Sequence, residues 1–433
     1  MKEHVESFAS SADPLKALAA AVKTGDIAQA DRIIERHPEV KAKLDDPMPD
    51  QAFGGTFLIA AVQRTDREMI SLLLRAGADI NARSHWWAGG FGVLDDDHGL
   101  ASFLIERGAT VDGHAAARLG LFERLKEVVS ANPGVVHARG GDGQMPLHFA
   151  SSIQIAEYLL DHGADIDARD IDHESTAAQY MGRERQEVAR YLVKRGCRTD
   201  ILMAAALGDL ELVRKHLETN PGCIRMSVSD DYFPRQNPHS GGTIYNWVFG
   251  SNKIAHSIAR EFGHEEIFRF LMEHSSDELK LSVACGLGDG GRVKELLANH
   301  PNLVRTLPEG ERGKLAHAAR DNNTEAVRLM LESGWPVDVR GQHGATPLHW
   351  AAFHGNAPMA EIILRYHPPL EVKDSDFDGT PLGWAIHGSE HGWHCKTGDY
   401  LRTVEALLKA GAEYVGERTG TDAVRQVLER YRK

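Results

Sequence analysis

Three long stretches of this sequence concentrate tryptophan, tyrosine, histidine and aspartate, the residue types that most often bind ligands or transfer protons. They cover residues 85–98, 229–250 and 387–400. A long stretch between secondary-structure elements is uncommon unless it is functional or disordered. The second stretch is rich in aromatic residues and poor in lysine and glutamate, which argues against disorder. We therefore expect it to form an ordered loop folded over a binding surface.

Aspartates in the first two stretches come in pairs that could perform acid–base chemistry. Asp95 and Asp97 form one pair, and Asp230 and Asp231 form the other. Cleavage of a glycosidic bond needs one protonated and one ionised carboxyl group, roughly 5–10 Å apart. A carbohydrate-active hydrolase or lyase is therefore one hypothesis, with these four aspartates as catalytic residues. The sequence has no serine nucleophile elbow, phosphate-binding glycine loop, HExxH motif or dinucleotide fingerprint, which disfavours those chemistries.

Aromatic, histidine and acidic side chains of the three stretches are the candidate ligand contacts. These are Trp86, Trp87, Tyr232, Tyr245, Trp247, Glu390, His391, Trp393 and Asp399. Two interpretations of Trp86 and Trp87 stay open, a stacking platform beside carboxylates or a cover over an irregular part of the fold. The carbohydrate hypothesis uses the tryptophans and tyrosines as platforms for sugar rings.

The third stretch holds three histidines, His387, His391 and His394, at spacings of four and three residues, with Cys395 beside the last. Such a set could ligate a transition metal. Glycines within the stretch are expected to break a helix there, so that no single face presents all three rings. We predict no metal site and no cofactor.

The elements that must position these residues are best read from the segment 344–356. Thr346 can cap a helix through its hydroxyl group, and Pro347 suits the first helical position because its missing N–H costs nothing there. The small pair Ala351 and Ala352 lets a second helix approach closely, and Gly355 with the following asparagine ends the first helix. Such a helix pair cannot cover its own apolar face, so it implies further stacked pairs.

Weaker copies of this segment recur at residues 56–61, 145–150 and 380–385, and Gly-Ala-Asp strings follow the second helices at 77–82 and 163–168. The chain therefore resembles the ankyrin-repeat family from end to end, in about twelve units with a period near 33 residues. The resemblance implies an all-α solenoid with hairpin fingers. It also implies a concave groove, formed by first helices and fingers, where ligands usually sit.

This resemblance predicts one continuous solenoid over residues 1–433. Its expected parts are a capping unit at 1–50, units two to seven at 51–228, an inserted finger at 229–253, units eight to twelve at 254–412 and a capping helix at 413–433. The third unit is expected to have a short first helix and a second helix near residues 98–106. The segment 384–400 together with unit eleven looks like a bacterial subset of the family.

Alignment to the repeat sorts the remaining candidates. Phe353, His354 and His387 fall at the concave end of a first helix and join the candidate ligand contacts. Other residues are expected to be structural: hydrogen-bonding histidines at 148 and 349, core residues at 256, 317, 350 and 384, and turn-forming aspartates at 170 and 374.

Composition limits the partners. The net charge of −13 argues against a nucleic-acid or anionic-membrane surface. Four scattered cysteines without a CxxC pair indicate reduced thiols, and residues 1–14 lack the apolar run of a signal peptide, so a cytoplasmic protein is expected. Ankyrin arrays mostly bind proteins, which favours a non-catalytic binding module with a basic or neutral partner. A glycan or other small ligand in the groove is the alternative, and whether the chain is an enzyme stays open.

Overall fold

The computed structural model describes residues 13–414 and 419–431, and within them it contains α-helices and short 3-10 helices but no β-strand. Two isolated antiparallel bridges join Arg169 to Thr176 and Ser227 to Ile254. The chain divides into two compact units: unit 1 is Met1–Leu207 with Val228–Gly250, and unit 2 is Gly208–Ser227 with Ser251–Lys433. The all-α prediction is confirmed. Continuity of one solenoid through both units stays a prediction.

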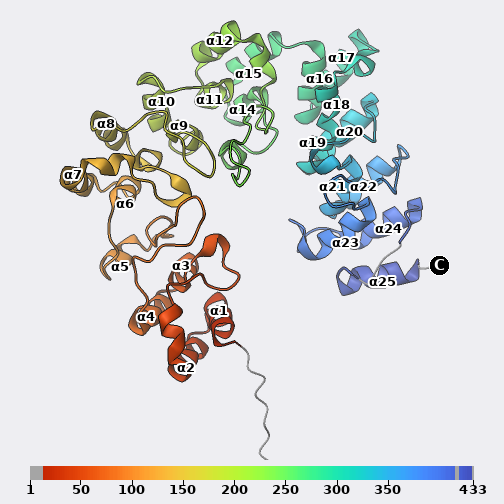
Figure 1. The fold of residues 1–433 in the computed structure, drawn as a ribbon. Helices are drawn as coiled ribbons and strands as arrows, with labels where there is room; N and C mark the ends of the chain where they lie inside the picture. Colours follow the sequence, from red (N-terminus) through yellow and green to blue (C-terminus); the bar gives the residue numbers. More distant parts are fainter. Residues whose placement is uncertain (1–12, 415–418, 432–433) are drawn as a thin grey trace, which may run out of the picture. The chain divides into compact units, whose positions relative to one another are not determined.

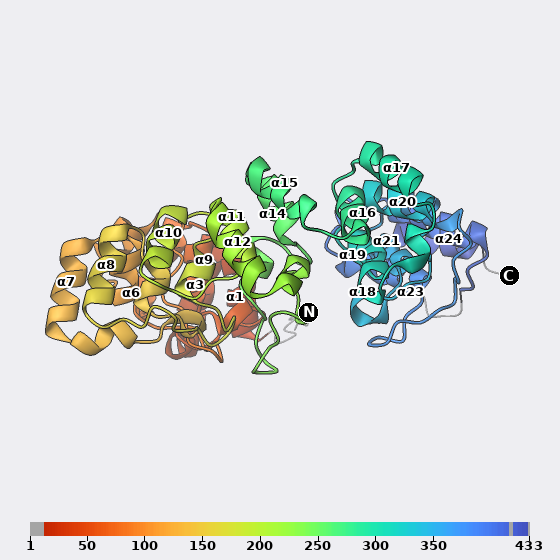
Figure 2. The ribbon, with the colours of Figure 1, turned by 90° about the horizontal axis from the view of Figure 1, so that it is seen from above.

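Unit 1 consists of paired helices joined by turns and fingers. Its helices are α1 (Pro14–Thr24), α2 (Ile27–Arg36), α3 (Phe57–Gln63), α4 (Arg67–Ala76), α5 (Ala101–Ile105), α6 (Gly113–Arg118), α7 (Phe122–Ala131), α8 (Ile153–Asp161), α9 (Ala177–Tyr180), α10 (Gln186–Lys194), α11 (Ile201–Leu207) and α13 (Tyr245–Val248). Short 3-10 helices are η1 (Pro38–Lys43), η2 (Ala52–Gly54), η3 (Pro133–His137), η4 (Gly141–Gly143) and η5 (Pro146–Phe149). Figure 2 shows α7, α8 and α10 side by side along the stack.

Unit 2 continues the same helix–turn–helix pattern. Its helices are α12 (Leu210–Thr219), α14 (Ala255–Glu261), α15 (Glu265–Glu273), α16 (Asp277–Gly286), α17 (Gly290–Asn299), α18 (Glu309–Arg312), α19 (Lys314–Arg320), α20 (Thr324–Ser333), α21 (Pro347–Phe353), α22 (Ala357–Leu364), α23 (Pro381–His391), α24 (Tyr400–Ala410) and α25 (Asp422–Arg430), with 3-10 helices η6 (Pro221–Arg225), η7 (Leu303–Thr306) and η8 (Gln342–Gly344). First helices α19, α21 and α23 pack in one row, and second helices α20, α22 and α24 pack in another (Figure 1).

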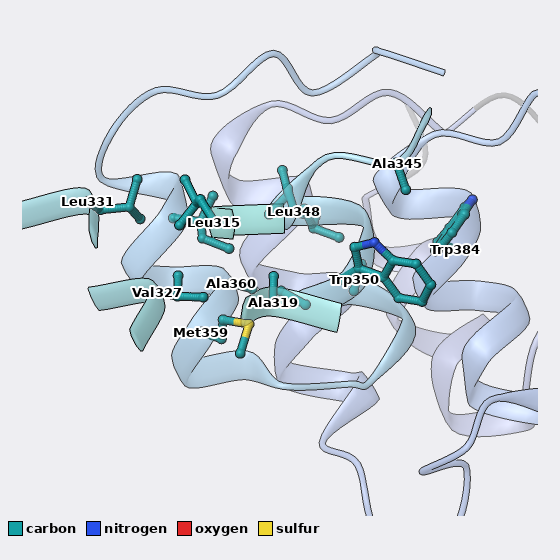
Figure 3. Packing of buried hydrophobic residues seen from close by; sticks show 14 of the residues in the cluster. Leu315, Ala319, Val327, Leu331, Ala345, Leu348, Trp350, Met359, Ala360 and Trp384 are labelled. Carbon is teal, nitrogen blue, oxygen red and sulfur yellow. The ribbon is translucent and has the colours of Figure 1, made fainter. Parts of the chain in front are cut away.

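The repeat segment folds as its sequence predicts. His349, at the third position of α21, receives the Thr346 N–H on Nδ1 at 3.1 Å, and its Nε2 lies 3.1 Å from the Gly379 carbonyl of the next finger. Ala351 and Ala352 are fully buried, beside Leu348 and Trp350 in the core drawn in Figure 3. The repeat is therefore held by local capping and by bonds to the following repeat.

Three local predictions need correction. The third unit lacks the short first helix that was predicted: residues 77–100 form turns and loops without a helix. Its second helix is α5. In unit five the first helix is a single 3-10 turn, Pro146–Phe149. The glycines of the third insertion do not break its helix, since α23 continues through Gly388 to His391. A Cβ at Gly388 would lie 2.6 Å from the Phe353 carbonyl oxygen, so glycine there allows α23 to pack closely against α21.

Candidate functional sites

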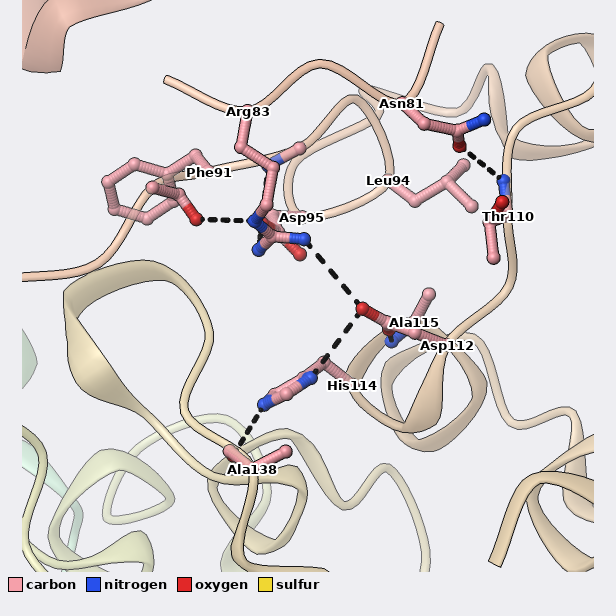
Figure 4. A network of polar contacts seen from close by, with 12 residues as sticks. Asn81, Arg83, Phe91, Leu94, Asp95, Thr110, Asp112, His114, Ala115 and Ala138 are labelled. Atoms are coloured by element: carbon pink, nitrogen blue, oxygen red, sulfur yellow. Dashed lines mark hydrogen bonds and ion pairs between the residues drawn. The ribbon is translucent and has the colours of Figure 1, made fainter. Parts of the chain in front are cut away.

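Two arginines hold the first pair of predicted catalytic aspartates, and Figure 4 shows Asp95 beside Arg83. Asp95 accepts a hydrogen bond from Arg83 at 2.8 Å and another from the Gly92 N–H at 2.6 Å, and its burial raises its pKa. Asp97 is buried, pairs with Arg118 and accepts the Ala101 N–H at 2.6 Å. Each carboxylate thus serves a different arginine. These bonds give both carboxylates a structural role in the loop, and the catalytic role stays a prediction.

The second insertion is ordered and docks onto the neighbouring finger of unit 1, residues 170–176. The Gln236 and Asn237 N–H groups donate to the Glu174 carboxylate, and the Ile244 N–H donates to the Ser175 hydroxyl at 3.1 Å. Side-chain Oγ of Ser240 donates to the Asp172 carbonyl at 2.5 Å. These bonds tie residues 236–244 of the insertion to one finger.

Neither member of its predicted catalytic pair is buried. Asp230 is exposed and lies 3.0 Å from Arg235, and Asp231 is also exposed. Tyr245, predicted as a ligand contact, is 0% exposed and donates to Asp200 at 2.9 Å. Burial raises its pKa well above the ordinary value. Tyr245 is therefore not an exposed ligand contact, as was predicted. It anchors the insertion, because the short α13 turns its ring inward.

Between this insertion and the finger lies a pocket of about 340 Å³. It is lined by Arg169, His173, Glu174, Ser175, Thr176, Gln179, Arg198, Thr199, Asp200, Tyr232, Phe233, Pro234, Arg235, Gln236, Gly242 and Thr243. Three arginines face two carboxylates in this lining. Of the predicted ligand contacts, Tyr232 is the one that lines it.

The two insertions of unit 1 meet over three residues that the sequence analysis did not select, Asp142, Asp172 and His173. One ligand atom of each lies within 4.8 Å of the others. Nε2 of His173 is 3.6 Å from Asp172 and 3.9 Å from Asp142. Burial, and then the nearby Asp172 charge, raises the pKa of Asp142 to about 6, although His173 opposes the rise. We call these residues the finger triad.

Both insertions contribute to the surroundings of the finger triad. The Trp86 indole N–H donates to Asp142 at 2.9 Å, and the Trp247 ring lies 4.5 Å from the His173 ring, measured between centroids. Trp87 contacts the His239 ring at 6.0 Å. The two tryptophans therefore differ. Trp86 holds a carboxylate through its indole N–H, whereas the Trp87 ring is partly exposed and is the one available for stacking.

In unit 2, aromatic rings form a continuous surface over the first helices. Trp393 of the third insertion stacks on Trp350 of α21 with centroids 6.0 Å apart, and it contacts Phe353 edge-on at 5.3 Å. Phe377, on a finger, contacts Trp384 of α23 at 6.2 Å. Trp393 is 61% exposed and Phe377 67% exposed, whereas the two tryptophans below them are buried. We call these five residues the unit 2 aromatic surface.

A cation and a histidine extend this surface. The Arg320 guanidinium lies 5.8 Å from the ring centroids of both Trp350 and Trp393. His343 lies 5.4 Å from the Phe377 ring and pairs with Asp376 at 2.7 Å. An exposed aromatic face is suited to contact with a planar or cationic group of a ligand.

The other predicted contacts of the third insertion have mixed outcomes. His387 and His391 lie together on α23, exposed, with ring centroids 5.0 Å apart, and Glu390 is exposed beside them. His394 instead packs on His354 at 5.1 Å. Among the described residues, the three ligand atoms that lie within 4.8 Å of one another belong to the finger triad and not to these histidines.

Two predicted contacts there are structural, which is a correction. His354 is buried, and its Nε2 lies 2.8 Å from the Arg320 carbonyl oxygen, because the third insertion covers its ring. Burial lowers the pKa of His354 to about 4. Asp399 caps α24 by accepting the Arg402 N–H at 3.1 Å. Phe353 lies half-buried beneath Trp393 and keeps its place in the surface.

The predicted structural roles are confirmed except at His317. The His148 ring lies within hydrogen-bond distance of the Ser175 carbonyl, His256 is fully buried, and Trp350 and Trp384 are core residues. Asp374 accepts the N–H groups of residues 376, 377 and 379 and the Trp384 indole N–H. Asp170 binds its own finger in the same way. His317 is only partly buried.

Comparison with known proteins follows this architecture. A family model described as ankyrin repeats, three copies, matches residues 114–203, 281–376 and 315–418, and a single ankyrin-repeat model matches 53–85.

Relatives include a leucine-rich repeat serine/threonine-protein kinase of Caenorhabditis elegans, 29% identical over 37% of this chain and 7% of that protein. A human SH3 and multiple ankyrin repeat domains protein is 29% identical over 31% of this chain and 7% of that protein. The E3 ubiquitin-protein ligase KEG of Arabidopsis thaliana is 20% identical over 61% of this chain and 20% of that protein. The chain spans a fifth or less of each relative's length. All three are eukaryotic proteins, so they lend no support to the predicted bacterial subset, and none is named as a carbohydrate enzyme.

No helix in the described residues combines the length and apolar character that crossing a bilayer requires.

Proposed function

Because this chain belongs to the ankyrin-repeat family, we propose that it is a protein-binding module whose unit 2 aromatic surface grips a partner protein. The observation that supports this most is the exposure of Trp393 and Phe377 on top of buried tryptophans. Large rings held rigidly by a packed layer below them lose little side-chain entropy on binding, and tryptophan is enriched among residues that dominate binding energy. A contiguous exposed apolar patch of this kind marks an interaction surface.

Charges at the edge of this surface favour a neutral or basic partner segment. Asp376, Asp378 and Glu390 are exposed around the rings, and the chain carries a net charge of −13. We propose that an apolar side chain of the partner inserts between Trp393 and Phe377, with basic groups at its flanks. A cytoplasmic setting is the proposed compartment, supported by four free cysteines, three of them buried.

The test compares capture of a protein partner by the full-length wild type and by the double variant Trp393→Ala/Phe377→Ala. We expect the partner to be lost with the double variant. Trp247→Ala is a matched control, because Trp247 is 62% exposed against 61% for Trp393 but lies in unit 1. Capture that survives the double variant refutes the assignment, as does equal loss with the control.

A second candidate function is small-molecule binding in the unit 1 pocket. Arg169, Arg198 and Arg235 in its lining favour an anionic ligand, since guanidinium groups bind carboxylates and phosphates bidentately. The carbohydrate-active alternative is less favoured, because Asp95 and Asp97 are held by Arg83 and Arg118, and Asp230 by Arg235. A thermal-shift screen with anionic metabolites and neutral glycans tests this candidate. Stabilisation by an anion that disappears in Arg235→Ala supports it, and stabilisation by glycans alone contradicts it.

A further inference from the structure

We propose that Asp142, Asp172 and His173 bind one divalent transition-metal ion at the fingers of unit 1. The inference is separate from the partner surface of unit 2 and does not rest on it. It rests on four features of the finger triad: the carboxylate of the buried Asp172, the outer hydrogen bonds of the three residues, the spacing of their donor atoms, and the different residues at the same positions of a second finger pair.

The first feature is an oxygen of a buried aspartate that accepts no hydrogen bond from the described residues. The Asp172 side chain is only 8% exposed. Its Oδ1 accepts the Gly241 N–H at 3.1 Å, but no hydrogen bond from the described residues reaches Oδ2. That oxygen lies 3.6 Å from His173 Nε2, which is too long for a hydrogen bond. A carboxylate in a largely buried side chain is costly unless it is paired or coordinates a metal.

The second feature is that each residue of the finger triad makes a hydrogen bond through the side-chain atom that is not the proposed metal ligand. Oδ1 of Asp142 accepts the Trp86 indole N–H, and His173 Nδ1 lies 3.0 Å from the Gly242 carbonyl oxygen. A carbonyl can only accept, so Nδ1 carries the proton and the Nε2 lone pair is left for a ligand bond. Metal-binding histidines almost always donate their other N–H to a carbonyl or carboxylate, which fixes the tautomer. Here the outer partners come from both insertions.

Spacing is the third feature. Two donors bound to one ion at about 2.1 Å lie roughly 3.0–3.5 Å apart in octahedral or tetrahedral geometry. The observed separations from His173 Nε2 are 3.6 Å to Asp172 Oδ2 and 3.9 Å to Asp142 Oδ2. Side-chain shifts of a few tenths of an ångström would bring them to coordination distance.

The fourth feature is a matched finger pair in unit 2. The Ile171 N–H donates to the Asp142 carbonyl at 2.9 Å, and the Ser375 N–H donates to the His343 carbonyl at 2.7 Å in the same way. These bonds align Asp142 with His343, and therefore Asp172 with Asp376 and His173 with Phe377.

At the unit 2 positions a histidine and an aspartate pair directly at 2.7 Å, and the third residue is a phenylalanine. At the unit 1 positions two carboxylates and a histidine stand apart. The two carboxylates repel each other. A cation bound between them would neutralise their charge, as His343 does for Asp376 in the unit 2 finger.

The donor set narrows the ion. One imidazole nitrogen with two carboxylate oxygens suits zinc, manganese or iron(II), whereas magnesium and calcium prefer all-oxygen sets. Three protein donors leave positions open for water or for an anionic ligand. His173 also lines the arginine-containing pocket, so such a ligand could reach the ion from there.

The test is calorimetric titration of chelator-treated full-length chain with Zn²⁺, and in parallel with Mg²⁺. We expect one Zn²⁺ per chain, no comparable Mg²⁺ binding, and at least about a 100-fold weaker Zn²⁺ affinity in Asp172→Asn and in His173→Gln, because each removes a direct ligand. Asp376→Asn, at the matching finger position of unit 2, should bind as the wild type does. His391→Ala controls for the exposed histidines of the third insertion.

Several outcomes overturn the proposal: no stoichiometric Zn²⁺ binding by the wild type, unchanged affinity in Asp172→Asn and His173→Gln, or loss confined to His391→Ala. Circular dichroism checks that the variants fold. A readout that needs no variant is the Co²⁺ spectrum of the wild type. Oxygen and nitrogen donors give weak d–d bands alone, whereas a site using Cys395 would add a thiolate charge-transfer band and refute the assignment.

Discussion

Replacing His256 by leucine should protect unit 2 against mild acid. His256 lies in α14, fully buried, and its Nε2 lies 2.8 Å from the Ser275 hydroxyl, which itself donates to the Leu271 carbonyl. Nε2 therefore carries the proton, and Nδ1 is buried without a partner. Protonating Nδ1 would bury an unpaired charge. Burial accordingly lowers the pKa of His256 from 6.5 to about 4.

The magnitude follows from proton linkage. Because the folded-state pKa is lowered, the stability that neutral His256 contributes is complete above pH 6.5 and is lost as the pH falls toward 4. At pH 5 the histidine of the unfolded chain is protonated, because this pH is about 1.5 units below its pKa of 6.5. The histidine of the folded chain is still mostly neutral. Each unit is worth about 1.4 kcal/mol, so the wild type should lose about 2 kcal/mol between pH 7 and pH 5 through this one residue.

His256→Leu removes that loss and keeps the Ser275 bond to Leu271. Urea unfolding followed by tryptophan fluorescence, at about pH 7 and about pH 5, should show the variant gaining about 2 kcal/mol relative to wild type at the lower pH. His274→Leu, the same change at an exposed histidine just after α15, controls for the replacement itself. An equal difference between His256→Leu and wild type at both pH values would refute the reasoning.

Two further predictions concern the fingers. Gly143→Ala should destabilise unit 1 by about 2 kcal/mol or more, since its φ is +72° and a Cβ would lie 2.4 Å from the Ile171 side chain. Gly77→Ala, also at positive φ but with nothing within 4 Å, should cost clearly less in the same urea titration, and equal costs would contradict the packing argument. Asp374→Ala should destabilise unit 2 by roughly 2–4 kcal/mol, because three backbone N–H groups and the Trp384 indole lose their acceptor. A shift of unfolding by less than about 0.5 kcal/mol would show that water replaces that carboxylate.

Local chemistry explains why much of the fold could be predicted. A helix start such as Thr346–Pro347, a small pair such as Ala351–Ala352 and a turn aspartate such as Asp374 act within a few residues of one another. Their hydrogen bonds and burial follow from the segment and its immediate neighbour in the stack. The same reasoning failed at Gly388, because a glycine that breaks an isolated helix is tolerated where another backbone must approach it closely.

The amino-acid sequence by itself determined the repeat, its capping and turn residues, and the positions of the three insertions. Only the tertiary structure decided which candidate side chains face inward, as Tyr245 and His354 do, and which stay exposed, as Trp393 does. It also brought Asp142 beside Asp172 and His173. The physical reason is that capping depends on residues close in sequence, whereas burial and convergence depend on how successive fingers stack and where an insertion docks.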